Sequence, residues 1–110
     1  MSVEQSSPQP SVSVKKVVIS PSKIKGKKLT AVFYDKDNKK IKTVHFGAAG
    51  MSDFTIHKDE YRKKRYLDRH RSRENWDDPM TGGALARFVL WNKTTRKASI
   101  ADYKRRFKLL

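Results

Sequence analysis

An excess of positive charge limits what this chain can fold into. Its 110 residues include 26 Lys or Arg and 11 Asp or Glu, so the net charge is +15 at neutral pH. This length is enough for one small domain and too short for two, and its core must be small because hydrophobic residues make up 36% of the chain and charged residues 34%. Eleven aromatic side chains (5 Phe, 4 Tyr and 2 Trp) should supply much of the core, because each buries a large apolar area.

The same charge predicts a polyanionic partner. Self-repulsion of this size destabilises an isolated compact state, and a bound polyanion relieves it. Nucleic acid is the commonest such partner, and an acidic protein or an anionic membrane surface would also serve. The sequence contains no Cys, which excludes disulfides and thiolate metal sites. No apolar run approaches the roughly 20 residues that a membrane span needs, and the first residues lack the apolar block of a signal peptide.

The first 28 residues are predicted to form an extended tail outside the folded domain. Residues 1–14 are mostly Ser, Pro, Gln and Val, a composition that cannot offset the entropy of ordering unless a partner orders it. Residues 15–28 contain six Lys and no acid and should form a flexible basic arm, although residues 17–19 could pair as a short strand. On this basis a single domain extends over residues 29–110, and the tail is dispensable for folding.

The folded part should begin with a β-hairpin. Residues 29–34 (LTAVFY) and 41–46 (IKTVHF) are rich in β-branched and aromatic residues, and the turn-forming stretch DKDNKK separates them. Alternation along the second strand places Val44 and Phe46 on one face. Residues 52–57 (SDFTIH) could add a third short strand.

Two helices are predicted after the hairpin. The first covers residues 58–73, begins with acidic residues that suit the positive end of a helix, and has a narrow apolar stripe around Tyr66. The second should begin with Thr81 as its N-cap. Its apolar face is broad enough for a core helix and consists of Ala84, Leu85, Phe88, Val89 and Trp91.

A third helix should end the chain. Ser99 is the predicted N-cap, and Asp102 could complete a variant of the capping box. The apolar residues that then repeat on one face are Ile100, Tyr103, Phe107 and Leu110. The fold class is therefore α+β: a small β-hairpin or three-stranded antiparallel sheet followed by three helices, with an extended N-terminal tail.

The most basic segment is YRKKRYLDRHRSRENW, residues 61–76. Residues 57–73 hold eight basic and three acidic residues, a net charge of +5. Arg65 and Arg69, four residues apart on a helix, repel each other mildly, whereas Arg suits bidentate contact with phosphate. A merely solvated face would also explain the composition, since Lys and Arg stems cover apolar surface. We favour an anion-binding surface, with the aromatic residues of the segment packed inward.

Three segments supply the candidate anion-binding residues. The basic helix contributes Arg62, Lys63, Arg65, Arg69, Arg71 and Arg73. The N-terminal arm contributes Lys23, Lys25, Lys27 and Lys28, and the last helix contributes Lys104, Arg105 and Arg106. No pattern points to base-specific readout, so binding should be largely independent of sequence. Exposed aromatic residues, for which Tyr61 and Trp76 are the best candidates, could add stacking on single-stranded bases.

Neither a metal site nor a local catalytic motif is present in the sequence. The three His lie on different predicted elements without metal-ligand spacing, so we expect no metal, no cofactor and no catalytic residue. A small nuclease stays open as an alternative, because catalytic residues that are separated in the sequence can converge in space. The candidate residues are His57, His70, Asp53, Asp59 and Glu74. The stretch from Ser20 to Lys23 (SPSK) resembles a proline-directed phosphorylation site, but a flexible linker is the simpler interpretation.

Several short motifs occur in combination between residues 29 and 107. They are HFG followed by SDFTIHKD, R-Y-x-x-R-H with ENW, LWNK, and S-I-x-D-Y-K-x-R-F. In this combination the chain resembles a family of short, uncharacterised basic proteins of large DNA viruses of algae and amoebae (nucleocytoplasmic large DNA viruses). The resemblance implies a viral origin and carries over no catalytic residue. It raises two roles, a virion component or a protein acting on viral nucleic acid.

The leading hypothesis is a non-enzymatic basic viral protein, located in the virion and in the host cell interior during infection. It would bind nucleic acid through phosphate contacts without base specificity. The alternative is a minor capsid or structural protein, whose basic surface meets acidic surfaces of other virion proteins and whose tail wraps its neighbours. A tail in extended contact with protein would favour the alternative, and a free tail beside a continuous basic face would favour nucleic acid.

Overall fold

A computed structural model describes residues 13–110 of the chain. An antiparallel sheet comes first, with strands β1 (Val14–Pro21), β2 (Lys27–Asp35) and β3 (Lys40–Ala48) in the spatial order β1-β2-β3. The helices follow as α1 (Phe54–His57), α2 (Glu60–His70), α3 (Gly82–Leu85), the π-helix η2 (Ala86–Leu90) and α4 (Arg96–Phe107). This order confirms the predicted α+β class, a three-stranded antiparallel sheet followed by helices.

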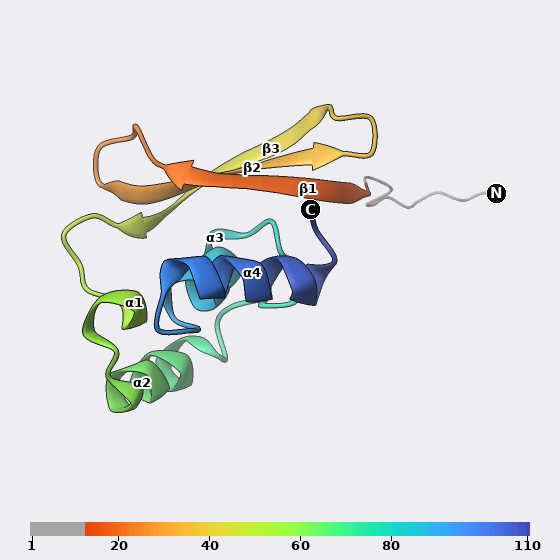
Figure 1. The fold of residues 1–110 in the computed structure, drawn as a ribbon. Coiled ribbons are helices and arrows are strands. Elements are labelled where there is room, and N and C mark those ends of the chain that lie inside the picture. Colours follow the sequence, from red (N-terminus) through yellow and green to blue (C-terminus); the bar gives the residue numbers. More distant parts are fainter. Residues whose placement is uncertain (1–12) are drawn as a thin grey trace.

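One face of the sheet packs against the helices, as the alternation of the strands requires. Val17 of β1 lies opposite Phe33 of β2, and Leu29 of β2 lies opposite Phe46 of β3. All four side chains are buried. Val44 also packs against this core, so the predicted inward face of β3 is confirmed. Figure 1 shows α3 and α4 beneath the sheet, with α2 on the side of the helical layer away from it.

The core between the layers is centred on residues of β2, α3, η2 and α4. Its fully buried side chains include Phe33, Leu85, Val89 and Tyr103, which is consistent with the predicted core helix. The Tyr103 hydroxyl donates a hydrogen bond to the Pro79 carbonyl oxygen at 2.6 Å. This bond satisfies the one polar atom that the ring takes into the core.

The π-helix η2 controls where the chain leaves the core. The Trp91 amide donates to the Ala86 carbonyl oxygen at 3.0 Å, a wide turn that ends the helix. Leu90 then packs closely on the end of β3. A Cβ atom at Gly47 would lie only 2.9 Å from Leu90 Cδ1, and the φ of this glycine is +80°. Glycine is therefore required at residue 47 both for its conformation and for the close approach.

The domain begins earlier than the predicted boundary at residue 29. β1 pairs with β2 from Val14 to Pro21, and the Val17 side chain is only 1% exposed. Leu110 lies along the outer edge of β1, where its amide donates to the Lys15 carbonyl oxygen at 2.9 Å. The interpretation of residues 15–28 as an arm outside the domain is therefore wrong, and SPSK spans the end of β1 and the following turn. Residues 1–12 of the predicted tail lie outside the described residues.

The region predicted as a third short strand and one long helix forms two helices instead. Asp53 accepts a hydrogen bond from the Thr55 amide at 2.9 Å and starts α1, so the strand predicted over residues 52–57 is wrong. Lys58 ends α1 with a left-handed φ of +55°. The next residue, Asp59, caps α2 by accepting from the Tyr61 and Arg62 amides. The two N-caps, Asp53 and Asp59, lie six residues apart, so the helix predicted over residues 58–73 begins at Glu60 and ends at His70 as α2.

Of the two N-caps predicted for the last helices, one is confirmed and one is wrong. Thr81 caps α3 by accepting from the Ala84 amide at 3.1 Å, as predicted. α4, however, is capped by Thr95 rather than by Ser99. Ser99 is fully buried one turn further on, where its hydroxyl accepts from the Lys93 amide at 2.9 Å. Among residues 13–110, no helix is long and apolar enough to cross a membrane.

The apolar face of α4 agrees with the sequence except at its end. Tyr103 is buried, and Ile100 and Phe107 pack against the core. Lys108 takes a left-handed φ of +56° and ends the helix. The chain therefore turns Leu109 into the core and leaves Leu110 79% exposed, opposite to the predicted repeat.

Candidate nucleic-acid interface

The orientation of α2 is fixed by its aromatic residues. Tyr66 is buried and stacks on Trp91, with ring centroids 4.3 Å apart and an interplanar angle of 3°. His70 stacks on Tyr66 at the same centroid distance. Burial raises the pKa of Tyr66 to about 12, and the nearby Glu74 carboxylate adds to the effect. This stack holds one side of α2 against the end of η2 and leaves its basic side outside.

Three arginines of α2 line one groove. Arg62, Arg65 and Arg69 are spaced three and four residues apart, which puts them on the same side of the helix. With Met51, Ser52 and Trp91 they surround a groove of about 280 Å³. Within residues 13–110, none of the three guanidinium groups has a carboxylate at ion-pair distance. All three are exposed, so their hydrogen-bond donors are available to an anion.

A larger cavity adjoins this groove. It has a volume of about 470 Å³ and lies between the end of β3, α2 and the start of α3. The groove and the cavity share four residues, which are Met51, Ser52, Arg69 and Trp91. Titratable side chains on the cavity wall include Lys28, Asp53, His70 and Glu74. Arg69 therefore stands where a groove that suits anions meets a larger cavity with both polar and apolar walls.

A buried ion pair forms one wall of the cavity. The Asp53 side chain is 1% exposed and accepts a hydrogen bond from Lys28 Nζ at 2.5 Å. The Arg96 guanidinium lies 3.9 Å from the same carboxylate. Burial raises the pKa of Asp53, but the hydrogen bonds from Lys28 and Thr55 outweigh it and leave the pKa below its ordinary value. The carboxylate is thus charged at neutral pH and ties β2 to α1.

We expect Asp53→Asn to lower the free energy of unfolding by about 1–3 kcal/mol at pH 7, because Lys28 loses a charged acceptor in a buried setting. The pKa of Asp53 is lower in the folded protein than its ordinary value near 4. The ionised side chain therefore contributes fully to the free energy of unfolding above about pH 4, and this contribution is lost as the pH falls through the pKa of the folded state. Urea unfolding of both proteins should therefore show a difference at pH 7 that shrinks below about pH 4.

The exposed pair of Lys64 and Asp68 provides the control for this experiment. Asp68→Asn removes the same charge from a solvated i, i+4 pair and should leave unfolding near the wild-type value. A variant at Asp53 as stable as wild type at pH 7 would show that the Lys28 pair does not hold β2 to α1.

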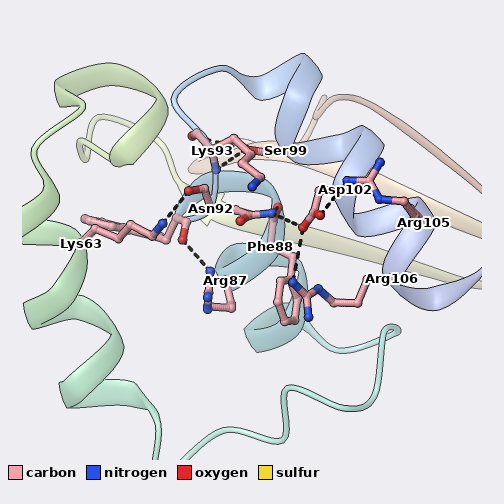
Figure 2. Close-up of polar contacts among 10 residues, drawn as sticks. Lys63, Arg87, Phe88, Asn92, Lys93, Ser99, Asp102, Arg105 and Arg106 are labelled. Atoms are coloured by element: carbon pink, nitrogen blue, oxygen red, sulfur yellow. Dashed lines mark hydrogen bonds and ion pairs between the residues drawn. The ribbon is translucent and has the colours of Figure 1, made fainter.

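Part of the predicted basic surface already has partners within the protein. Figure 2 shows Asn92 between α2 and α4, where its Nδ2 donates to the Asp102 carboxylate at 2.8 Å. Lys63 Nζ donates to the Asn92 carbonyl oxygen at 2.7 Å. Arg105 and Arg106 both pair with Asp102, at 2.9 and 3.5 Å. Lys63 therefore links α2 to the segment before α4, and Arg105 and Arg106 pair with Asp102 within α4, so all three are poorer candidates for phosphate contacts than predicted.

The remaining predicted residues lie at three places. Arg71 and Arg73 follow α2, and Arg73 donates to the Arg69 carbonyl oxygen at 3.3 Å. Lys104 is half-buried on α4 and does not line the groove. Lys28 is in the ion pair with Asp53, whereas the exposed basic residues of the β1–β2 turn and the start of β2 are Lys23, Lys25 and Lys27. Figure 1 shows this turn at the same end of the molecule as α1 and α2.

Only some of the residues predicted for base stacking and for catalysis lie where those roles require. Tyr61 is 69% exposed, as expected, but Trp76 packs against the core. Asp53, His70 and Glu74 line the same cavity, and His70 Nδ1 lies 3.3 Å from a Glu74 carboxylate oxygen. The other two nuclease candidates, His57 and Asp59, do not line it. Within residues 13–110, no group of three or more His, Cys, Asp or Glu side chains is arranged to hold a metal ion.

The comparisons with known proteins cover only the first part of this architecture. Residues 17–70 match the model of a family of unknown function (DUF5754). The matched segment runs from β1 to the end of α2, just under half of the chain, and includes the arginine groove residues of α2. The chain is similar to this family over that segment. No curated protein and no solved structure matches the chain.

Proposed function

We propose that the protein binds nucleic acid through its phosphates, without base specificity and without catalysing a reaction. The groove of Arg62, Arg65 and Arg69 carries this proposal, because none of the three has a carboxylate partner among residues 13–110. Each guanidinium can give two parallel hydrogen bonds to a phosphate. Seven residues of helix span about 10 Å, which corresponds to about three steps of 3.4 Å along one DNA strand.

The lysines of the β1–β2 turn support the same proposal. Lys23, Lys25 and Lys27 are exposed, and Figure 1 shows their turn at the end of the molecule that also holds α2. Lysine contacts phosphate as a point charge, which adds affinity but little orientation. We therefore assign the arginine groove to positioning the backbone and the turn to additional electrostatic attraction.

The proposal includes a viral origin and association with the virion, for which the motif resemblance is the support. The alternative role, a minor capsid protein, depended on an extended segment of 28 residues wrapping its neighbours. β1 occupies residues 14–21 of that segment and pairs within the protein's own sheet. This pairing shortens the segment that could wrap a neighbour, and so it favours nucleic acid as the partner.

Phosphodiester cleavage is a second candidate, because Asp53, His70 and Glu74 line one cavity beside the arginines. Asp53, however, caps α1 and is paired with Lys28, so it is already committed to the structure. The His70–Glu74 pair is left as the only acid–base candidate among the cavity residues that were predicted from sequence. We rank cleavage below binding for this reason.

Titration of a fluorescently labelled duplex of random sequence between about 50 and 200 mM salt tests the proposal. Wild type should show log K falling linearly with log salt, with a slope near −0.9 for each phosphate contacted. Replacing Arg62, Arg65 and Arg69 together by Gln should weaken binding and make the slope shallower by up to about 3. Electrophoresis of the recovered duplex should show it intact.

A matched control removes the same charge elsewhere. Lys36, Lys39 and Lys40 are exposed around the β2–β3 turn, so their replacement by Gln lowers the net charge equally. Equal losses for the two triple variants would show that bulk charge, not the groove, binds the duplex. No binding by wild type at about 50 mM salt would refute phosphate binding and favour the capsid role, and shortened products would favour cleavage.

A further inference from the structure

The cavity beside the arginine groove is not explained by phosphate contacts alone. It is larger than the groove, about 470 against 280 Å³, and part of its wall is apolar, formed by Ala86, Leu90 and Trp91. Its volume is in the range of sites that enclose small organic groups. We infer that this cavity admits one unpaired base, so that the protein binds single strands more tightly than duplex. The inference rests on the proposed function and specifies the form of nucleic acid.

The position of the cavity supports this inference. Arg69 and Trp91 belong to both the groove and the cavity, and the Met51–Ser52 loop borders both. A strand whose phosphates contact the arginines would therefore pass the mouth of the cavity. In a single strand a base can turn into such a site at little cost, whereas in a duplex it must first be unpaired and unstacked, which costs a few kcal/mol.

The charges on the wall favour a base over a second phosphate. Glu74 lines the cavity, whereas the charge of the other acid of the lining, Asp53, is offset by its ion pair with Lys28. A carboxylate repels phosphate but accepts a hydrogen bond from an exocyclic amino group of a base. Arg69, on the same wall, can donate to ring nitrogens and carbonyl oxygens, whereas His70 Nδ1 faces the Glu74 carboxylate. The neutral base edge, with donors and acceptors together, is the better match for this mixture.

The cavity is also held open by rigid neighbours. The rings of Trp91, Tyr66 and His70 stack in series, with successive centroids 4.3 Å apart. Glu74 rests against Gly83, where a Cβ atom would collide with its carboxylate. A site whose walls are fixed before binding loses little conformational entropy when it is filled. Gly82, in contrast, borders the cavity with no atom within 4 Å of a Cβ built on it.

Gly82 offers a way to fill the cavity without disturbing its walls. Its φ does not lie in the left-handed region, so Gly82→Leu introduces no backbone strain. Ala101→Leu provides the matched control, since Ala101 is exposed on α4 and does not line the cavity. Both variants keep all the arginines, and both add an apolar side chain at an exposed helical position.

The experiment compares three oligonucleotides of equal length: a single strand, the corresponding duplex, and a strand with every base replaced by an abasic spacer. We expect wild type and Ala101→Leu to bind the base-containing single strand about tenfold more tightly than the abasic strand, because a base in the cavity can stack on Trp91. Gly82→Leu should lose this preference and bind the duplex with wild-type affinity.

The outcomes distinguish failure of base binding in the cavity from failure of the proposed phosphate binding. Equal wild-type affinities for the base-containing and abasic strands would overturn the inference while leaving phosphate binding intact, and this comparison does not depend on any variant folding. Equal weakening of single-strand and duplex binding by Gly82→Leu would also overturn it. Failure of wild type to bind all three oligonucleotides would instead refute the proposed function.

Discussion

Removing residues 1–21 is expected to abolish the cooperative unfolding transition. The deletion takes away β1, and with it the ladder to β2 from Val14 to Pro21 and the fully buried Val17 side chain. Phe33, which lies opposite Val17, would lose its cover on that side. Domains of this size are stable by about 5–15 kcal/mol in total, so the loss of one strand of a three-stranded sheet leaves too little to maintain the fold.

Circular dichroism during thermal unfolding measures this effect, with a protein lacking only residues 1–12 as the control. That control keeps the whole of β1 and the Leu110 contact with its edge, so it should retain a cooperative transition. The same transition in the protein lacking residues 1–21 would show that β1 is not part of the core. The domain boundary would then return to residue 29, where sequence alone placed it.

β1 was placed outside the domain, with residues 17–19 only as a possible short strand, because the charge of the surrounding residues dominates this segment. Residues 15–28 contain six Lys, and within β1 only Val17 is fully buried, with Ile19 partly buried. Such a segment has too little apolar surface to fold by itself. It becomes a strand because β2 presents Phe33 and Ala31 opposite these two residues. That partner is a property of the tertiary structure, and the local pattern in residues 15–28 indicated only that residues 17–19 could pair.

Strands β2 and β3 and the start of the second predicted helix were predictable because their signals are local. Alternation along β3 was sufficient to orient Val44 and Phe46, and Thr81 caps α3 through its own neighbouring amides. The start of α4 was ambiguous on the same grounds, since both Thr95 and Ser99 are good N-cap residues. Ser99 is used instead to hold the Lys93 amide, a contact that follows from how the loop folds back and not from spacing.

The candidate site was predictable in its charges but not in its shape. The arginines of α2 were found because they are dense and regularly spaced. Nothing in the sequence distinguishes Lys63, which reaches a backbone carbonyl of residue 92, from Arg62, which faces the groove. The walls supplied by Met51, Ser52 and Gly82 carry no chemical signature of binding. Packing of α2 on Trp91 creates the cavity, so only the folded arrangement reveals it.

Phe88→Ala is expected to lower the free energy of unfolding by about 3–5 kcal/mol, as truncation of a buried Phe does in a packed core. Phe88 is 6% exposed and contacts Phe107 edge to face, with ring centroids 5.5 Å apart. The Arg106 guanidinium also lies 4.6 Å from the centre of its ring. Truncation therefore leaves a cavity between η2 and α4 and removes the surface on which Arg106 rests.

Thermal unfolding of Phe88→Ala, Phe107→Ala and Arg69→Ala tests the packing of these elements. Phe88→Ala should lower the midpoint by more than about 10 °C, and Phe107→Ala by less, because Phe107 is only half-buried. Arg69→Ala removes an exposed side chain, and the backbone carbonyl of residue 69 can still accept the hydrogen bond from Arg73. The unfolding midpoint of this variant should therefore match that of wild type. A wild-type midpoint for Phe107→Ala would show that the end of α4 does not pack on η2. A lowered midpoint for Arg69→Ala would mean that this arginine holds the fold together, and its part in the groove would then have to be measured apart from stability.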